Sequence, residues 1–68
     1  MFPLEEAKQG FMQFVRRVRS GKIFYPTLTL ERLRSGDDQF FFRGKPIDKT
    51  IVAEWLKEPE VQRAFRDI

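Results

Sequence analysis

The chain has 68 residues, 13 basic against 10 acidic, and contains neither cysteine nor histidine. We expect one small domain spanning residues 1–68, whose stability must come from packing or from a partner, because disulfides and the usual zinc ligands are excluded. No apolar run reaches the roughly 20 residues needed to cross a bilayer. The acidic start MFPLEEAK differs from a signal peptide, so we expect a cytoplasmic protein without membrane contact.

The first predicted element is a helix that begins near Pro3 and ends at Gly21. Proline suits a first helical turn, and Glu5 and Glu6 complement the positive end of the helix dipole. Gly21 can take the left-handed conformation that ends many helices. Gly10 within the helix predicts a kink or a close approach by another element. Helical spacing predicts one buried apolar face, formed by Leu4, Ala7, Phe11, Phe14, Val15 and Val18.

A hairpin is the first interpretation of the central region. IFYPTLTLERL is rich in β-branched and aromatic residues, QFFFRGKPI is a second such run, and RSGDD between them is a turn signal. The hairpin would pair Lys22–Leu33 with Gln39–Ile47, leaving Pro26 at an edge or bulge. Alternation along Phe40–Phe42 sends the outer two rings to one face and the middle ring to the other, so at least two should enter the core.

A short helix is the alternative for the first half of this region. Thr27 or Thr29 can act as the helix cap, since a threonine hydroxyl accepts a hydrogen bond from a free N–H of the first turn. The helix would then run through Leu33 and end at Gly36, in an Arg-Ser-Gly sequence like the one that ends the first helix. The sequence leaves both interpretations of residues 27–34 open.

Two short helices are predicted for the C-terminal third. Asp48 is a suitable N-cap for a helix that runs to about Lys57, and Pro59 suits the first turn of another. Their apolar positions follow helical spacing. The expected fold is therefore α+β: an N-terminal helix, a β-hairpin, a helix and a short C-terminal helix. The apolar positions of these last two helices are Ile51, Val52, Trp55 and Leu56, then Val61, Ala64, Phe65 and Ile68.

The positive charge lies in the middle of the chain. Residues 16–45 hold eight basic residues against three acidic ones, whereas the flanking segments are slightly acidic. A basic region of this kind predicts contact with the phosphates of double-stranded DNA. The ten aromatic residues can fill a small core and still anchor self-association, so we expect a homodimer. The candidate nucleic-acid-binding residues are Arg16, Arg17, Arg19, Lys22, Arg32, Arg34, Arg43 and Lys45.

Enzymatic activity is not expected. The chain lacks histidine and cysteine, and it contains neither a phosphate-binding Walker loop nor the Gly-x-Ser-x-Gly turn of serine hydrolases. The neighbouring acids Glu5 and Glu6 are explained by a helix start, and Asp37 with Asp38 by a turn. We therefore predict no catalytic residues, no cofactor and no metal, and look for function in recognition.

Two stretches resemble a family of small regulators. EEAKQGFMQFVRRVRSGK is similar to the opening of the prevent-host-death (Phd/YefM) antitoxins, in which Glu-Ala-Lys begins a helix and a glycine ends it, and FRGKPI is similar to that family's basic hairpin turn. This resemblance implies a dimeric DNA-binding domain that represses its own operon, with a C-terminal segment that wraps a toxin. RSGK, FFFRGK and AEWL also resemble parts of excisionase and MerR-type regulators. Both likenesses imply transcription regulation in a phage or plasmid setting.

A protein-interaction module is the competing hypothesis. In this interpretation the chain is a phage-encoded or accessory factor that docks on a host protein through Trp55, Phe65 and neighbouring apolar residues, because aromatic residues are common interface anchors. A third possibility is an assembly protein of a phage particle, which would form a defined higher oligomer.

Overall fold

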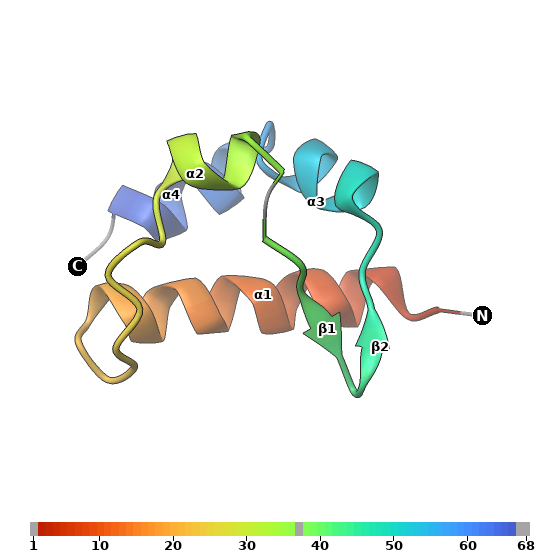
Figure 1. The fold of residues 1–68 in the computed structure, drawn as a ribbon, viewed down its shortest axis with the longest axis horizontal. Coiled ribbons are helices and arrows are strands. Elements are labelled where there is room, and N and C mark those ends of the chain that lie inside the picture. Colours follow the sequence, from red (N-terminus) through yellow and green to blue (C-terminus); the bar gives the residue numbers. More distant parts are fainter. Residues whose placement is uncertain (1, 37, 67–68) are drawn as a thin grey trace.

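A long helix is followed by a short helix, a hairpin and two more helices in the computed structural model, which describes residues 2–36 and 38–66 (Figure 1). The expected α+β class, with its N-terminal helix, hairpin and short C-terminal helix, is confirmed. No helix of these residues is long and apolar enough to cross a membrane. The elements are α1 (Leu4–Arg19), α2 (Leu30–Arg34), β1 (Phe41–Phe42), β2 (Lys45–Pro46), α3 (Lys49–Trp55) and α4 (Pro59–Arg66).

Helix α1 has the predicted limits and most of the predicted buried face. It begins after Pro3, and Gly21, with φ +85°, ends the turn that follows it. Most of the predicted apolar positions are buried or half-buried, and Met12 joins them. Leu4 was expected to be buried but is 46% exposed. The physical reason is its place in the first turn, which extends beyond the helices that cover the rest of α1 (Figure 1).

The long hairpin predicted for Lys22–Leu33 and Gln39–Ile47 is wrong, and the short-helix alternative is confirmed. Thr29 Oγ1 accepts a hydrogen bond from the backbone N–H of Arg32 at 3.1 Å and so caps α2. The alternating TLTL sequence therefore leads into a helix, because the threonine cap competes successfully with strand pairing.

The segment between α1 and α2 contains turns instead of a strand. Pro26, expected at a strand edge or bulge, lies in a turn that is closed by a hydrogen bond from Leu28 N–H to the Tyr25 carbonyl at 3.2 Å. Proline suits such a turn because its φ is already fixed near the required value. Leu28 is only 2% exposed, so the turn returns the chain to the core just before α2 begins.

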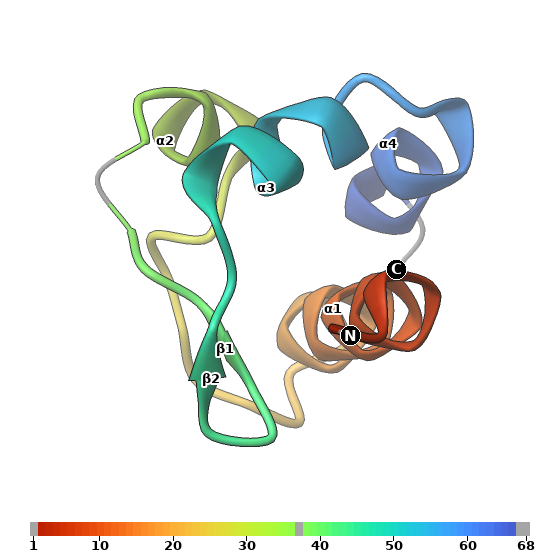
Figure 2. The same ribbon diagram turned by 90° about the vertical axis from the view of Figure 1, so that its right-hand side faces the viewer.

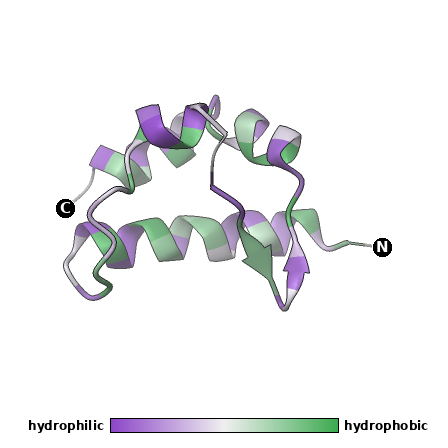
Figure 3. Cartoon of the chain, in the orientation of Figure 1, coloured by the Kyte–Doolittle hydropathy of each residue, from purple (hydrophilic) through white to green (hydrophobic). Residues whose placement is uncertain are grey.

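The observed hairpin is much shorter than predicted. Phe41 pairs with Pro46 and Phe42 with Lys45, and both residues of the connecting turn, Arg43 and Gly44, have positive φ. Such a two-residue turn matches the twist of the strands. The predicted alternation is confirmed, since the rings on either side of Phe41 are half-buried while Phe41 itself is 63% exposed. In Figure 3 β1 is hydrophobic and β2 hydrophilic.

The hairpin lies against the N-terminal half of α1, and Gly10 allows this contact. A Cβ atom at position 10 would lie 3.1 Å from Cε1 of Phe42. That distance is shorter than an ordinary van der Waals contact between carbon atoms. The close approach predicted from this glycine is therefore confirmed, and it determines which part of α1 the hairpin covers.

The last two helices begin as predicted. Asp48 Oδ1 accepts a hydrogen bond from Thr50 N–H at 2.8 Å, and α3 follows, although it ends at Trp55, earlier than the predicted Lys57. Pro59 opens α4, and its apolar positions up to residue 65 are buried. The prediction for Ile68 lies outside the described residues.

One buried apolar cluster joins the elements within the described residues. Helices α2, α3 and α4 form a row, with α4 packed on α1 at one end of it and the hairpin, below α2 and α3, standing beside α1 (Figure 2). Each element except β1 and β2 contributes side chains to the cluster, together with the connecting segments. Its members are Ala7, Phe11, Met12, Val15, Leu28, Leu33, Ile47, Val52, Trp55, Leu56, Val61, Ala64 and Phe65.

We expect Asp48→Ala to lower the free energy of unfolding by about 1 kcal/mol, because the first turn of α3 loses its side-chain acceptor. Asp48→Asn keeps an oxygen acceptor and should cost much less. Urea denaturation followed by circular dichroism measures both variants. Equal unfolding midpoints for the alanine variant and the natural chain would show that this cap does not stabilise the helix.

Candidate nucleic-acid interface

The eight predicted cationic residues do not form one patch. The structure divides them into the end of α1 with its following turn, helix α2, and the hairpin. The physical reason is the position of the hairpin, which packs against Gly10 and the N-terminal half of α1 instead of folding back beside the C-terminal end. The three groups are Arg16, Arg17, Arg19 and Lys22; Arg32 and Arg34; and Arg43 and Lys45.

The arginine of the hairpin turn is already engaged within the chain. Arg43 Nη2 lies 3.0 Å from Glu6 Oε2, and its guanidinium carbon lies 4.9 Å from the centre of the Phe42 ring. Both partners of the ion pair are well exposed, so the pair contributes little to stability. The Glu6 carboxylate nevertheless places a negative charge beside Arg43. Lys45 is exposed on β2, where it pairs with Phe42 of β1.

The two cations of α2 have separate surroundings. Arg32 Nε lies 3.4 Å from Asp38 Oδ2, and the Asp38 side chain is largely buried. Arg34 lines a shallow depression together with Lys57 of the segment after α3 and Gln62 of α4. These arginines therefore belong to the side of the molecule that α2 shares with α3 and α4, and they do not extend the α1 group.

A larger basic group gathers where α1 and α4 both end. The two helices run in the same direction, and the last turns of both carry arginines. Arg19 and Arg66 line one depression, together with Glu31. We call this group the basic end; its residues are Arg16, Arg17, Arg19, Lys22, Arg63 and Arg66.

The cations of the basic end are not neutralised by ion pairs. None of the six lies within salt-bridge distance of a carboxylate among residues 2–36 and 38–66. The Nε of Arg19 is buried and has no hydrogen-bond partner within this part of the chain. Asp67 follows Arg66 in the sequence and lies outside the described residues. Four of the six were predicted; Arg63 and Arg66 were missed because their sequence segment is acidic overall.

The opposite ends of the same two helices are held together by Lys8. Its Nζ lies 2.9 Å from Glu58 Oε1, 3.0 Å from Glu60 Oε1 and 3.5 Å from Glu5 Oε2. The hydrogen bonds to Glu58 and then Glu60 raise the pKa of Lys8 above its ordinary value. This contact joins the second turn of α1 to the start of α4. Together with the buried apolar side chains that the two helices share, it supports the parallel alignment that brings Arg19 and Arg66 to the same end.

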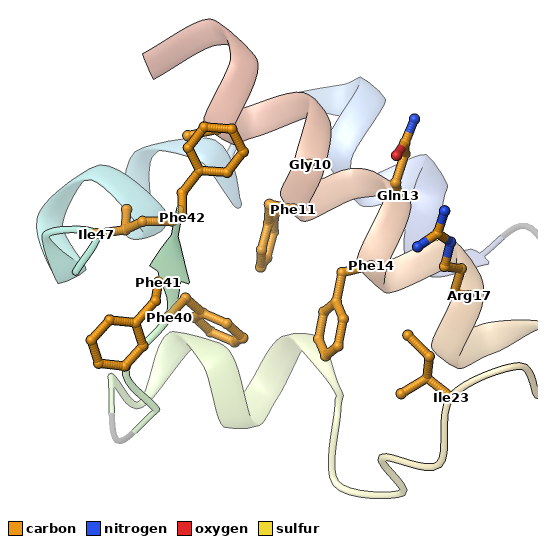
Figure 4. A pocket seen from close by; sticks show the side chains of 11 residues that line it. Gly10, Phe11, Gln13, Phe14, Arg17, Ile23, Phe40, Phe41, Phe42 and Ile47 are labelled. Atoms are coloured by element: carbon orange, nitrogen blue, oxygen red, sulfur yellow. The ribbon is translucent and has the colours of Figure 1, made fainter. Parts of the chain in front are cut away.

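An aromatic groove lies between α1, the segment after it, and β1 (Figure 4). Its volume is about 410 Å³. The rings are packed against one another, with Phe40 5.3 Å from Phe11 and 6.3 Å from Phe14 between centroids. We define the aromatic groove by six apolar residues and two polar residues at its edge: Phe11, Phe14, Ile23, Phe40, Phe41 and Phe42, with Gln13 and Arg17.

Arg17 belongs to both surfaces. It is an exposed residue of the last turn of α1, and it also lines the aromatic groove. In Figure 4 the side chains of Gln13 and Arg17 are neighbours along α1 and project from it away from the Phe14 ring. Lys22 precedes Ile23, another lining residue. The basic end and the aromatic groove are therefore continuous.

The two residues predicted for protein docking are in the core. Trp55 is 6% exposed and Phe65 is 5% exposed, and both belong to the buried cluster. Both residues follow the helical spacing of the other apolar residues and lie on the faces that cover α1. Their side chains therefore pack in the core of this chain and are not exposed for docking. The large aromatic side chains that the structure exposes are Phe24, at 91%, and Phe41, at 63%.

No family model, curated protein or solved structure matches this chain. The resemblance to prevent-host-death antitoxins and to excisionase and MerR-type regulators stays a prediction, as does the expected homodimer. Within the described residues no group of three or more acidic side chains is arranged to hold a metal ion. The candidate site consists of the basic end and the aromatic groove beside it.

Proposed function

We propose that this chain is a small DNA-binding protein that contacts phosphates through its basic end. The observation that carries the proposal is that the ends of two parallel helices, with the turn after α1, carry six cationic side chains that have no carboxylate partner within the described residues, and that Arg19 and Arg66 line one depression. Arginine binds phosphate through two parallel hydrogen bonds, and the release of counterions from DNA favours such contacts whatever the sequence.

The proposed surface differs from the one predicted from the sequence. The four cations near the end of α1 are retained, and Arg63 and Arg66 of α4 are added. Arg32 and Arg43 are left out because each lies beside a carboxylate. A regulatory role in transcription, as in the families that the sequence resembles, is part of the same proposal, since phosphate contacts position a regulator on DNA while other residues select the sequence.

Salt dependence tests the proposal. Fluorescence anisotropy of a labelled duplex, titrated at several salt concentrations, should show an affinity that falls linearly with salt on logarithmic axes. The expected slope is about −0.9 for each phosphate contacted. The triple variant Arg16→Gln, Arg17→Gln, Lys22→Gln should bind more weakly, and the magnitude of its slope should be smaller by about 1 per residue removed.

A charge-matched control separates the basic end from overall charge. Lys45→Gln, Lys49→Gln, Lys57→Gln removes the same charge from exposed residues of β2, the start of α3 and the segment after it. This control should keep most of the affinity and slope of the natural chain. Equal losses in the two triple variants would contradict a specific basic surface, and an absence of binding at low salt would contradict the proposed function altogether.

A further inference from the structure

The aromatic groove carries an inference about the form of the nucleic acid, and this inference rests on the proposed function. Arg17 lies at the edge of the groove and is also part of the basic end. A phosphate bound by Arg17 would therefore be next to an apolar, ring-lined hollow. Phosphate and sugar make few favourable contacts with apolar side chains. A nucleobase makes many, because every base has an aromatic face.

We infer that the protein binds a single-stranded segment, with phosphates on the basic end and one unpaired base in the aromatic groove. The groove is lined by the half-buried rings of Phe14, Phe40 and Phe42, and a base in it would contact the parts of these rings that the core leaves uncovered. Gln13 is an exposed residue that also lines the groove, and its amide carries both donors and an acceptor for the polar edge of a base.

The spacing along α1 suits one nucleotide. Gln13 and Arg17 are four residues apart on one face of the helix, so their Cβ atoms are about 6 Å apart. That is the order of distance between a base and its own phosphate. In a duplex the bases are stacked on one another and present only their edges in the grooves, so their faces are closed to these rings.

The surrounding charges give the strand a direction. At the N-terminal end of α1 the neighbouring depression is lined by Glu5 and Glu6, which repel phosphate, and by Arg43, whose charge is paired with Glu6. At the other end the groove meets Arg17 and the turn that carries Lys22. The strand therefore leaves the groove toward the C-terminal end of α1. Phe41, which lines the groove and is 63% exposed, provides a ring for the neighbouring base on the hairpin side.

The test compares two labelled ligands, a thymidine-rich single strand of about 20 nucleotides and the duplex of the same sequence. This length exceeds one binding site. The natural chain should bind the single strand more tightly at equal salt. Phe41→Ala and Gln13→Ala should each weaken single-strand binding by about tenfold and leave duplex binding nearly unchanged. Both side chains are exposed, so the variants should remain folded, which circular dichroism verifies.

Leu4→Ala is the matched control, because Leu4 is an exposed apolar residue outside the groove. It should bind both ligands as the natural chain does. Equal affinity for single strand and duplex, with no effect of Phe41→Ala or Gln13→Ala, would overturn the inference and leave the proposed phosphate contacts standing. Binding to neither ligand would overturn both. A third outcome would also overturn the inference. If Phe41→Ala abolished binding of a protein partner but did not weaken single-strand binding, the groove would be a protein-binding site.

Discussion

Trp55→Ala is expected to unfold most of the chain. Trp55 is 6% exposed, and its ring lies 5.7 Å from that of Phe11 on the facing helix. Truncating a buried tryptophan costs about 3–5 kcal/mol, since contacts are lost and a cavity is left. Stability scales at roughly 0.05–0.15 kcal/mol per residue, so a domain of this size has only about 3–10 kcal/mol in total. The substitution therefore removes a large share of it.

Urea denaturation of Trp55→Ala and Trp55→Phe, followed by circular dichroism, measures this effect. The phenylalanine variant keeps an aromatic ring in the core and should retain a cooperative transition at lower urea. The experiment also distinguishes the two roles considered for Trp55. A docking anchor would leave the midpoint of the alanine variant unchanged, and that result would contradict the core position described here.

Phe11→Ala and Phe24→Ala are expected to give opposite results. Phe11 is 5% exposed, and its ring contacts those of Phe40 and Trp55. Its truncation should cost about 3–5 kcal/mol. Phe24 is 91% exposed, and the same substitution there should change the free energy of unfolding by less than about 0.5 kcal/mol.

The pair removes the same atoms from two places, so each variant serves as the control for the other. Thermal and urea unfolding of both should show a large decrease for Phe11→Ala and a near-natural curve for Phe24→Ala. A similar loss in the two variants would mean that the segment after α1 packs more tightly than its exposure indicates. Phe11→Leu, which keeps an apolar side chain, should lie between them.

Much of the helical structure could be predicted because its signals are local. The limits of α1 follow from Pro3, Gly21 and apolar spacing, and Asp48 and Pro59 mark the starts of α3 and α4. Capping and periodicity act within one or two turns, so they do not depend on the rest of the fold.

The central region was harder because two local signals compete there. Residues 27–30 alternate as a strand would, yet Thr29 also supplies a cap, and the cap prevails. β-Propensity describes how well a side chain suits a half-buried pleated surface, so it decides little without a partner strand. Once α2 forms, residues 30–34 are not available for pairing, and the strands of the hairpin lie between Phe41 and Pro46.

The candidate site depended on tertiary placement, which the charge pattern does not contain. The sequence grouped Arg43 and Lys45 with the end of α1, but the contact between Gly10 and Phe42 brings the hairpin to the other half of that helix. Conversely, Arg66 lies in an acidic segment, and only the parallel alignment of α4 with α1 brings it beside Arg19. Long-range contacts therefore decided which cations share a surface.

The parallel alignment of α1 and α4, to which Lys8 contributes, separates positive from negative charge along the length of the molecule. Carboxylates gather where α1 and α4 start and guanidinium groups where they finish, and these full charges outweigh the peptide dipoles, whose partial charges have the opposite sign at each end. In the field of a polyanion such a molecule would turn before contact, presenting its arginine-rich pole first. Reversing α4 would reduce this torque while leaving the net charge unchanged.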